Sequence, residues 1–182
     1  ILFSTWPTIA QAEKRVALVI GNSSYEHVSS LPNPQNDASD MAAALEELGF
    51  TVRRKNDLGR HAMRDVLADF SDTATGADMA VVFFAGHGIG IDKQNYLIPT
   101  DAKLSTDRKI KFETVPLDTV LASMDGVTGV RMILLDACRN NPFAAKMKLT
   151  SSTRSVARGL SRVEPSRGTL ISFAAKDGTT AD

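Results

Sequence analysis

The chain has 182 residues, which is enough for one domain with a substantial core but too few for two domains of ordinary size. Its 21 Lys and Arg residues balance its 21 Asp and Glu residues, so it lacks the basic excess of a typical nucleic-acid-binding domain, and we expect no nucleic-acid partner. The single cysteine, Cys138, excludes a disulfide within the chain. A lone thiol is either a small buried hydrophobic group or a reactive one.

The first twelve residues are mostly apolar and end in Ala10-Gln11-Ala12, a pattern typical of a signal-peptidase site. We interpret residues 1–12 either as the remnant of an export signal, which would make the protein periplasmic or secreted, or as an N-terminal arm of a cytoplasmic protein. No run reaches the roughly 18 apolar residues that span a bilayer, so we expect no membrane span. The domain itself is expected over residues 13–182.

Alternating strands and helices are predicted along the first half of this domain. Val16–Ile20 is a short apolar run, typical of a strand that is covered on both faces. The breaker Leu31–Pro34 precedes a helix that Asn36 or Asp37 would cap, and Gly49 is a natural stop for this helix.

The same alternation continues to the end of the chain. The further elements predicted, in chain order, are a strand at Phe50–Arg53, a helix through Met63, Val66, Leu67, Phe70 and Ala74, a strand at Met79–Ala85, a hairpin at Ile89–Ile98 turning at Asp92–Asn95, a helix through Leu117, Val120, Leu121 and Met124, and strands at Val130–Leu135 and Thr169–Ala174. Strands separated by helices imply right-handed crossovers and a mostly parallel α/β sheet. Residues 144–167 are rich in Ser, Thr, Lys and Arg without a clean period, and we expect a flexible loop there.

Two chemically active side chains follow neighbouring strands of the predicted sheet. His87 follows Met79–Ala85, and Cys138 follows Val130–Leu135. Ligands of open parallel sheets bind beyond the carboxyl ends of the strands, so imidazole and thiol should share one crevice. A neighbouring imidazole allows a thiol to attack as a thiolate. Either residue alone is more often structural, but their joint placement favours catalysis.

Glycines surround the histidine. Gly86 and Gly88 let the backbone turn sharply and leave room for a substrate chain to approach. The amides of Gly88 and Cys138 could then form an oxyanion hole, in which each donor is typically worth about 2.7–4 kcal/mol.

Several segments together resemble the caspase superfamily, specifically the bacterial metacaspase-like (orthocaspase) branch. The matching segments are Arg15–Asn22 (RVALVIGN), Leu31–Ala38 (LPNPQNDA), Val82–Gly88, Asn95–Asp101 (NYLIPTD), Leu134–Phe143 (LLDACRNNPF) and Ser172–Asp182. The interval of 51 residues from His87 to Cys138 agrees with the roughly 50 residues expected for caspases.

The resemblance implies a caspase-like αβα sandwich and a cysteine endopeptidase that works through an acyl-enzyme without a cofactor. Members of this branch cleave after Arg or Lys and hold that side chain with two acids, which match Asp37 and Asp136. A buried cation needs a paired carboxylate, and two carboxylates suit a guanidinium. The alternative roles are a helix cap for Asp37 and a solvated strand end for Asp136.

The sequence also departs from this branch. Ala85 stands where many members have Ser, which removes one polar contact. Of the acids that bind activating calcium in some relatives only Asp101 matches, and Lys103–Phe112 is basic, so we do not expect calcium dependence. The family continues into a small-subunit portion, which we expect as a partner of this chain. The basic residues of the loop at 144–167 are either self-processing sites or a solvated linker.

Two rival functions remain open from the sequence. One is a catalytically silent caspase-like module that binds a protein partner, and the other is a flavodoxin-like binding or signalling domain. The peptidase interpretation is preferred because neither rival gives a role to both His87 and Cys138.

Overall fold

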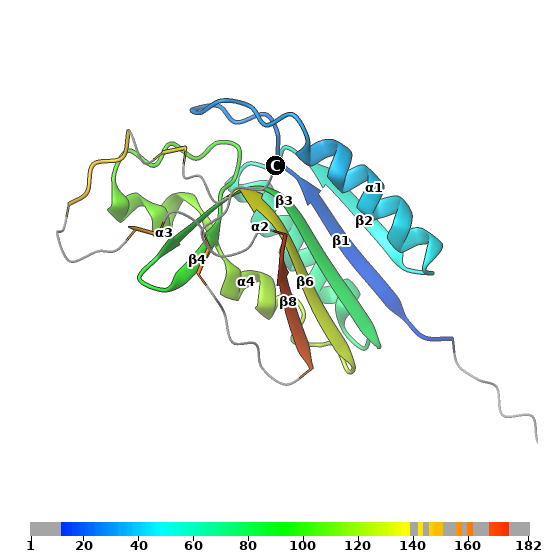
Figure 1. Cartoon of the computed structure of the whole chain (residues 1–182). Helices are drawn as coiled ribbons and strands as arrows, with labels where there is room; N and C mark the ends of the chain where they lie inside the picture. Colours follow the sequence, from blue (N-terminus) through cyan, green and yellow to red (C-terminus); the bar gives the residue numbers. More distant parts are fainter. Residues whose placement is uncertain are drawn as a thin grey trace, which may run out of the picture.

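The computed structural model describes residues 12–138, 142–143, 146–150, 156–157, 160–161 and 168–174, with the backbone alone at 138 and 156–157 (Figure 1). Its main sheet is parallel, in the strand order β2-β1-β3-β6-β8. The bounds are β1 Arg15–Gly21, β2 Thr51–Asn56, β3 Met79–Ile91, β6 Val130–Cys138 and β8 Thr169–Phe173. The sequence prediction of a mostly parallel α/β sheet is therefore confirmed.

Strand β3 is the centre of the structure because it belongs to two ladders. Its first part pairs with β1 on one side and with β6 on the other. Its last residues form an antiparallel hairpin with β4 (Gln94–Leu97), and β7 (Val156–Ala157) pairs with Gly90 and Ile91. β4 in turn pairs with β5 (Val115–Pro116). The hairpin turns at Asp92 and Lys93, which both have positive φ, as a tight two-residue turn requires.

Helices cover the two faces of the sheet (Figure 1). α1 (Pro34–Glu47) packs on β1, β2 and β3, while α2 (Arg60–Ala74) and α4 (Leu117–Ala122) cover the opposite face. A 3-10 turn, η1 (Asp107–Lys109), leads directly into α3 (Ile110–Glu113). Apolar side chains fill both interfaces, and the largest fully buried ones include Phe70 and Phe84.

Helix α1 begins earlier than its sequence predicts. Pro34 occupies the first turn and Asn33 precedes it, so Asp37 lies inside the first turn and does not cap the helix. The prediction of Asn36 or Asp37 as the cap is wrong, because proline lacks the N–H that is unsatisfied at a helix start and its fixed φ suits that position. The predicted stop is confirmed, since Gly49 adopts φ +82° and its N–H donates to the Glu46 carbonyl.

Parts of the segment expected as a flexible loop pack against the body of the protein. The Lys148 N–H donates to the Ser105 carbonyl, and Thr150 donates to the buried Asp107 carboxylate from both its amide and its hydroxyl. Leu160 is buried, and Ser161 exchanges hydrogen bonds with the Asn95 side chain. Apart from 146–150, 156–157 and 160–161, the stretch 144–167 lies outside the described residues, as do residues 1–11 with most of the predicted export signal.

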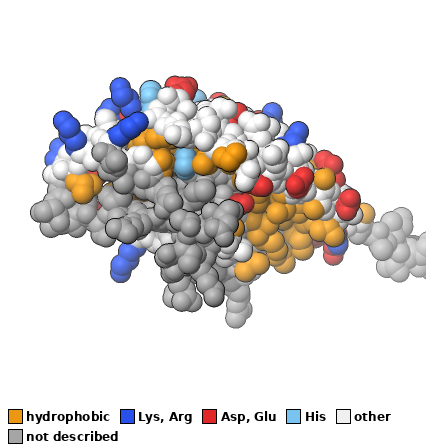
Figure 2. Space-filling model, turned by 45° about the horizontal axis from the view of Figure 1, so that its top comes forward, with side chains coloured by type: hydrophobic (Ala, Val, Ile, Leu, Met, Phe, Trp, Pro, Cys, Tyr) orange, Lys and Arg blue, Asp and Glu red, His pale blue; other side chains and the backbone are white. Residues whose placement is uncertain are grey.

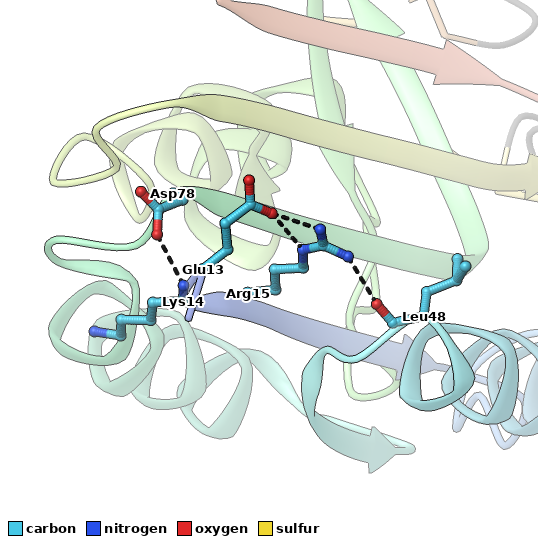
Figure 3. Close-up of polar contacts among 5 residues, drawn as sticks. All are labelled: Glu13, Lys14, Arg15, Leu48 and Asp78. Carbon is cyan, nitrogen blue, oxygen red and sulfur yellow. Dashed lines mark hydrogen bonds and ion pairs between the residues drawn. The ribbon is translucent and has the colours of Figure 1, made fainter. Parts of the chain in front are cut away.

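The amino ends of the strands are held by a separate set of polar contacts (Figure 3). The Lys14 N–H donates to Asp78 Oδ2 at 2.8 Å, just before β3. The Arg15 guanidinium donates to the Glu13 carboxylate and to the Leu48 carbonyl at the end of α1. These contacts tie the start of β1 to its neighbours at the edge remote from His87.

On the α1 side of the sheet, β6 and β8 carry partly exposed apolar side chains. Met132 and Leu134 are half-buried, and Leu170 is 50% exposed. Among the described residues, α1 makes its main contacts with β1, β2 and β3 on this side (Figure 1). Within the described part of the chain, no helix is both long and apolar enough to cross a membrane.

Candidate active site

Strand register brings the two sequence-predicted catalytic residues together. β3 and β6 run parallel, and their pairing sets Ala85 opposite Asp136, Gly86 opposite Ala137 and His87 opposite Cys138. Both strands thus deliver the imidazole and the cysteine backbone to the carboxyl edge of the sheet, where parallel α/β folds bind ligands. The sequence placed these residues in one crevice, and the structure makes them direct neighbours in the ladder.

His87 lies in an apolar setting. Its side chain is 5% exposed, and burial lowers its pKa to about 4. At pH 7 the imidazole is therefore neutral, which is the form that can accept a proton from a thiol. Neither ring nitrogen has a hydrogen-bond partner among the residues that the structure describes.

Tyr25 is the side chain seen against His87. The ring centroids lie 4.5 Å apart with the planes inclined at 49°. The Tyr25 hydroxyl accepts a hydrogen bond from the His87 backbone N–H at 2.8 Å and donates to the Ile98 carbonyl at 3.3 Å. Sequence reasoning missed Tyr25, because a single aromatic residue in the irregular segment after β1 carries no periodic signal.

The two glycines beside His87 are required by close contacts. Gly86 adopts φ +155°, and a Cβ there would lie 2.7 Å from the Tyr25 hydroxyl. A Cβ on Gly88 would lie 2.9 Å from Leu160 Cδ2 and 3.3 Å from the Ala137 Cβ. Side chains at these positions would displace the groups that surround the histidine.

The backbone of Gly88 is oriented by the β3–β4 hairpin. The Ile98 N–H donates to the His87 carbonyl, so His87 and Ile98 form a hydrogen-bonded position. Antiparallel pairs alternate, and the next pair, Gly88 with Leu97, therefore exchanges no ladder hydrogen bonds. The Gly88 N–H consequently points away from β4, toward the side of β3 on which β6 ends at Cys138.

The two predicted specificity carboxylates also lie near each other. Asp37 is in the first turn of α1, and Asp136 is two residues before Cys138 on β6; both are half-buried. Burial raises the pKa of Asp37, and the negative charges of Asp136 and Asp40 raise it further. Two like charges in a partly desolvated place favour the binding of a cation between them.

Asp57 organises the loop that joins this acidic site to the histidine. Its carboxylate accepts the Ser23 and Ser24 amides at 2.7 and 2.9 Å, the Ser24 hydroxyl at 2.9 Å and the Gln35 amide at 2.6 Å. Burial alone would raise the pKa of Asp57, but these hydrogen bonds outweigh it and lower the pKa. Asp57 thereby links the segment after β1, which carries Tyr25, to the start of α1.

Asn22 is a second scaffold residue that the sequence did not single out. It is fully buried; its side chain accepts the Leu58 N–H at 2.9 Å and donates to the Leu58 carbonyl. Its backbone N–H donates to the Ala85 carbonyl at the point where β1 and β3 separate. Its signal in the sequence is weak, because a polar residue after a strand reads as an ordinary turn.

Asp101, the one residue that matched the calcium ligands of some relatives, accepts a backbone hydrogen bond. Its Oδ1 accepts the Arg60 N–H at 2.8 Å, at the start of α2. Across the described residues, no group of three or more His, Cys, Asp or Glu side chains is placed to hold a metal ion. Within the described part of the chain, Asp101 thus holds the first turn of α2.

The edge that holds these residues is visible from outside (Figure 2). In this view acidic side chains gather mainly on the right of the molecule. A broad hydrophobic area lies below these acids.

Comparison with known proteins agrees with this arrangement. The sequence profile of the caspase domain matches residues 14–182, nearly the whole chain. The chain belongs to the caspase domain family. A caspase-like α/β fold and membership of a cysteine peptidase family are thereby established for it.

Individual relatives place the chain within a broad group of caspase-like proteins. Human mucosa-associated lymphoid tissue lymphoma translocation protein 1 is 28% identical over 149 residues, which cover 78% of this chain and 18% of that protein. Caspase-1-A of Xenopus laevis is 26% identical over 140 residues, or 71% of this chain and 35% of the relative. The chain thus spans about a fifth to a third of the length of these caspase-family relatives.

A solved structure shares the fold. The protein GSU0716 from Geobacter sulfurreducens matches with a TM-score of 0.53 and 21% identity over 69% of this chain and 50% of that one. At this level of identity the likeness concerns the fold alone.

Proposed function

We propose that this caspase-family domain is a cysteine endopeptidase of the metacaspase-like type that cleaves peptide bonds after Arg or Lys. The observation that carries the proposal is the β3–β6 register, which sets His87 opposite Cys138 at the carboxyl edge of the sheet. The neutral, buried imidazole and the Gly88 amide, which points away from β4 toward the side of β6, fit the needs of thiol catalysis.

The reaction would begin with proton transfer from the Cys138 thiol to His87 as sulfur attacks the substrate carbonyl carbon. The resulting oxyanion would accept hydrogen bonds from the amides of Gly88 and Cys138. His87 would then return the proton to the leaving amine as the C–N bond breaks, which leaves a thioester on Cys138. Water, deprotonated by His87, would hydrolyse this thioester and restore the thiol.

The choice of Arg or Lys at the cleaved position rests on Asp37 and Asp136. Burial, and after it the negative charge of Asp136, raise the pKa of Asp37, so the free site holds negative charge at an energetic cost. A substrate cation would relieve this repulsion, whereas a substrate aspartate would increase it. A guanidinium can also donate to both carboxylates at once.

Hydrolysis of matched fluorogenic peptides that end in Arg, Lys or Asp tests the proposal. The full-length protein should cleave the Arg and Lys peptides, and both Cys138→Ala and His87→Ala should reduce kcat by at least about a thousandfold. Glu47→Gln, on the exposed end of α1 away from the site, serves as a control that should leave kcat unchanged.

Each other outcome has a definite meaning. Cleavage after Asp alone would keep the peptidase and reject the role of Asp37 and Asp136. Absence of any cleavage, together with a Cys138 thiol that iodoacetamide does not alkylate below pH 8, would favour a silent interaction module.

A further inference from the structure

Among the described residues, His87 lacks the orienting partner that a catalytic base usually has. In other nucleophilic enzymes the base is held by a third group that bonds to its second ring nitrogen. Here neither ring nitrogen has such a partner among the described residues, although the ring is 5% exposed. Some other contact must keep the imidazole in one orientation if it is to meet the thiol.

Tyr25 supplies two contacts to His87 at once. Its hydroxyl accepts the backbone N–H at 2.8 Å, and its ring lies 4.5 Å from the imidazole, centroid to centroid. Tyr25 is itself 6% exposed and packs in the cluster that contains Ile89 and Ile98. It is therefore a fixed support and not a surface group.

The hydroxyl occupies an unusual place in the backbone ladder. At the position of His87 and Ile98, the Ile98 N–H donates directly to the His87 carbonyl. The reciprocal bond is not direct, because the His87 N–H donates to the Tyr25 hydroxyl, which donates to the Ile98 carbonyl. The side chain of Tyr25 is thus inserted into the ladder at the residue that bears the imidazole.

The glycine before the histidine makes this insertion sterically feasible. Gly86 has φ +155°, and any Cβ there would meet the Tyr25 hydroxyl at 2.7 Å. Beyond Ala85, β1 no longer pairs with β3, so the hydroxyl lies where the β1 backbone has turned away. Tyr25 comes from that departing segment, which Asp57 holds in place through Ser23 and Ser24.

We propose that Tyr25 is the positioning residue of His87: its hydroxyl fixes the backbone of the histidine, and its ring fixes the plane of the imidazole. This inference rests on the proposed function only in treating His87 as the base. Tyr25 takes no part in proton transfer. It acts by holding His87 in one orientation and by excluding water from the imidazole ring.

Three variants distinguish the effects of the Tyr25 hydroxyl and the Tyr25 ring on His87 from a general loss of core packing. Tyr25→Phe removes the hydroxyl and keeps the ring, whereas Tyr25→Leu removes both. Tyr96→Phe is the matched control, because Tyr96 is equally buried in the same cluster and its hydroxyl contacts Gln94 at 2.8 Å. Thermal unfolding of each variant shows that it is folded before it is assayed.

The kinetic readout is the division of the effect between kcat and KM for an Arg peptide. Tyr25→Phe should lower kcat on the order of tenfold with KM within about twofold, since a small displacement of the base slows chemistry more than binding. Tyr96→Phe should leave both unchanged. Equal kcat in the two phenylalanine variants would overturn the proposal.

A second readout does not need activity. The titration of His87 is followed by NMR through its ring C–H signal, assigned with His87→Ala; His27 and His61 are exposed. Among the side chains that the structure describes, Tyr25 is the titratable group seen against His87, and the backbone of Cys138 is its partner in the ladder; burial is the cause of the low pKa of His87. Opening the ring to water should therefore raise the His87 pKa from about 4 toward the ordinary 6.5 in Tyr25→Leu, and less in Tyr25→Phe.

The two readouts keep the inference separate from the proposed function. If the protein cleaves no peptide, the proposed function fails, but a His87 titration that moves in the Tyr25 variants and not in Tyr96→Phe still supports the positioning role. A titration that is the same in all folded variants overturns it. Should Tyr25→Leu not fold, Tyr25→Phe alone decides by the same criteria.

Discussion

Asp37 and Asp136 come from different elements, one from the first turn of α1 and the other from the end of β6. Nothing in their spacing of about a hundred residues relates them; they meet because α1 packs on the face of the sheet toward which Leu134 also points. The negative charge that raises the pKa of Asp37 includes the exposed Asp40, one turn nearer the middle of α1. Asp40 therefore serves as a control for Asp37, because it contributes negative charge from an exposed position.

Neutralising Asp37 should therefore impair recognition of basic substrates. We expect Asp37→Asn to lower kcat/KM for an Arg peptide by at least about thirtyfold, because loss of one partner in a desolvated charge pair typically costs about 2 kcal/mol or more. Asp40→Asn should lower it only a few-fold, since Asp40 is exposed and screened by water. Steady-state kinetics on both variants measure the difference.

An equal loss in the two variants would contradict a specific contact and would indicate a general electrostatic attraction. Raising the ionic strength separates these cases, because screening weakens long-range attraction more than a buried contact.

The residues that could be predicted from sequence are those that follow buried strands. His87 and Cys138 were found in this way, since an apolar run fixes where a parallel strand ends. Tyr25, Asn22 and Asp57 could not be found, because each lies in irregular chain and acts through contacts with segments distant in sequence. The roles of such residues can be recognised only in the three-dimensional structure, where the distant segments are in contact.

The turn after β2 is an element whose stability depends on one carboxylate. Asp57 adopts φ +52°, a conformation that Asn and Asp tolerate better than most residues. From this position its carboxylate accepts hydrogen bonds from Ser23, Ser24 and Gln35. These bonds fix the start of α1 relative to the end of β1. Because its pKa is lowered in the folded state, its contribution to stability is present above the unfolded pKa of about 3.9 and is lost as the pH falls through the lower folded value.

We predict that Asp57→Ala lowers the free energy of unfolding by roughly 1–2 kcal/mol at pH 7, a figure reduced for the partial exposure of this side chain. Part of this loss is the strain of a positive φ, which Asp57→Asn should largely avoid. Urea unfolding of both variants at pH 7 and at a series of progressively lower pH values measures the two contributions. Below the folded pKa, the wild-type protein and Asp57→Asn should approach equal stability; a difference that persists there would contradict the charge-based account.

Element boundaries show where sequence patterns lose information. The prediction ended the third strand at Ala85, but β3 continues to Ile91 because its later residues pair with β4 and β7. The short helix α3 was not predicted, since four residues hold too little periodicity to be recognised. The start of α1 was misplaced because the capping signal at Asp37 competed with the proline signal at Pro34.

At the scale of the whole molecule, the parallel topology concentrates stability in the inner strands. β3 is flanked by β1 and β6, and its residues 80–85 are buried on both faces. β2 lies at one edge with mostly exposed or half-buried side chains. We expect amide hydrogen exchange to be slowest in β3 and its two neighbours and markedly faster in β2. Exchange monitored by mass spectrometry tests this order, and equal protection of β2 and β3 would contradict it.

The fold class was predictable because it depends on periodicity that repeats along the chain. Five apolar strand runs and three helical patterns are enough to specify a parallel α/β sheet, and each corresponds to an observed element. The small antiparallel ladder around β4 was harder to foresee in full, because β5 and β7 have only two residues each. Their places are determined by pairing with the hairpin and not by their own composition.

The amino ends of the parallel strands form the end of the molecule opposite His87, which we call the second pole. There the Lys14 amide binds Asp78, and Gly76 donates to Gly126. β3 spans about nine residues between this pole and His87, roughly 30 Å at the usual rise of an extended strand. Gly49 lies at the same end, and a Cβ built there would meet no described atom within 4 Å other than those of its chain neighbours. Attachment to a sensor surface through this end would therefore leave the edge that carries His87 facing the solution.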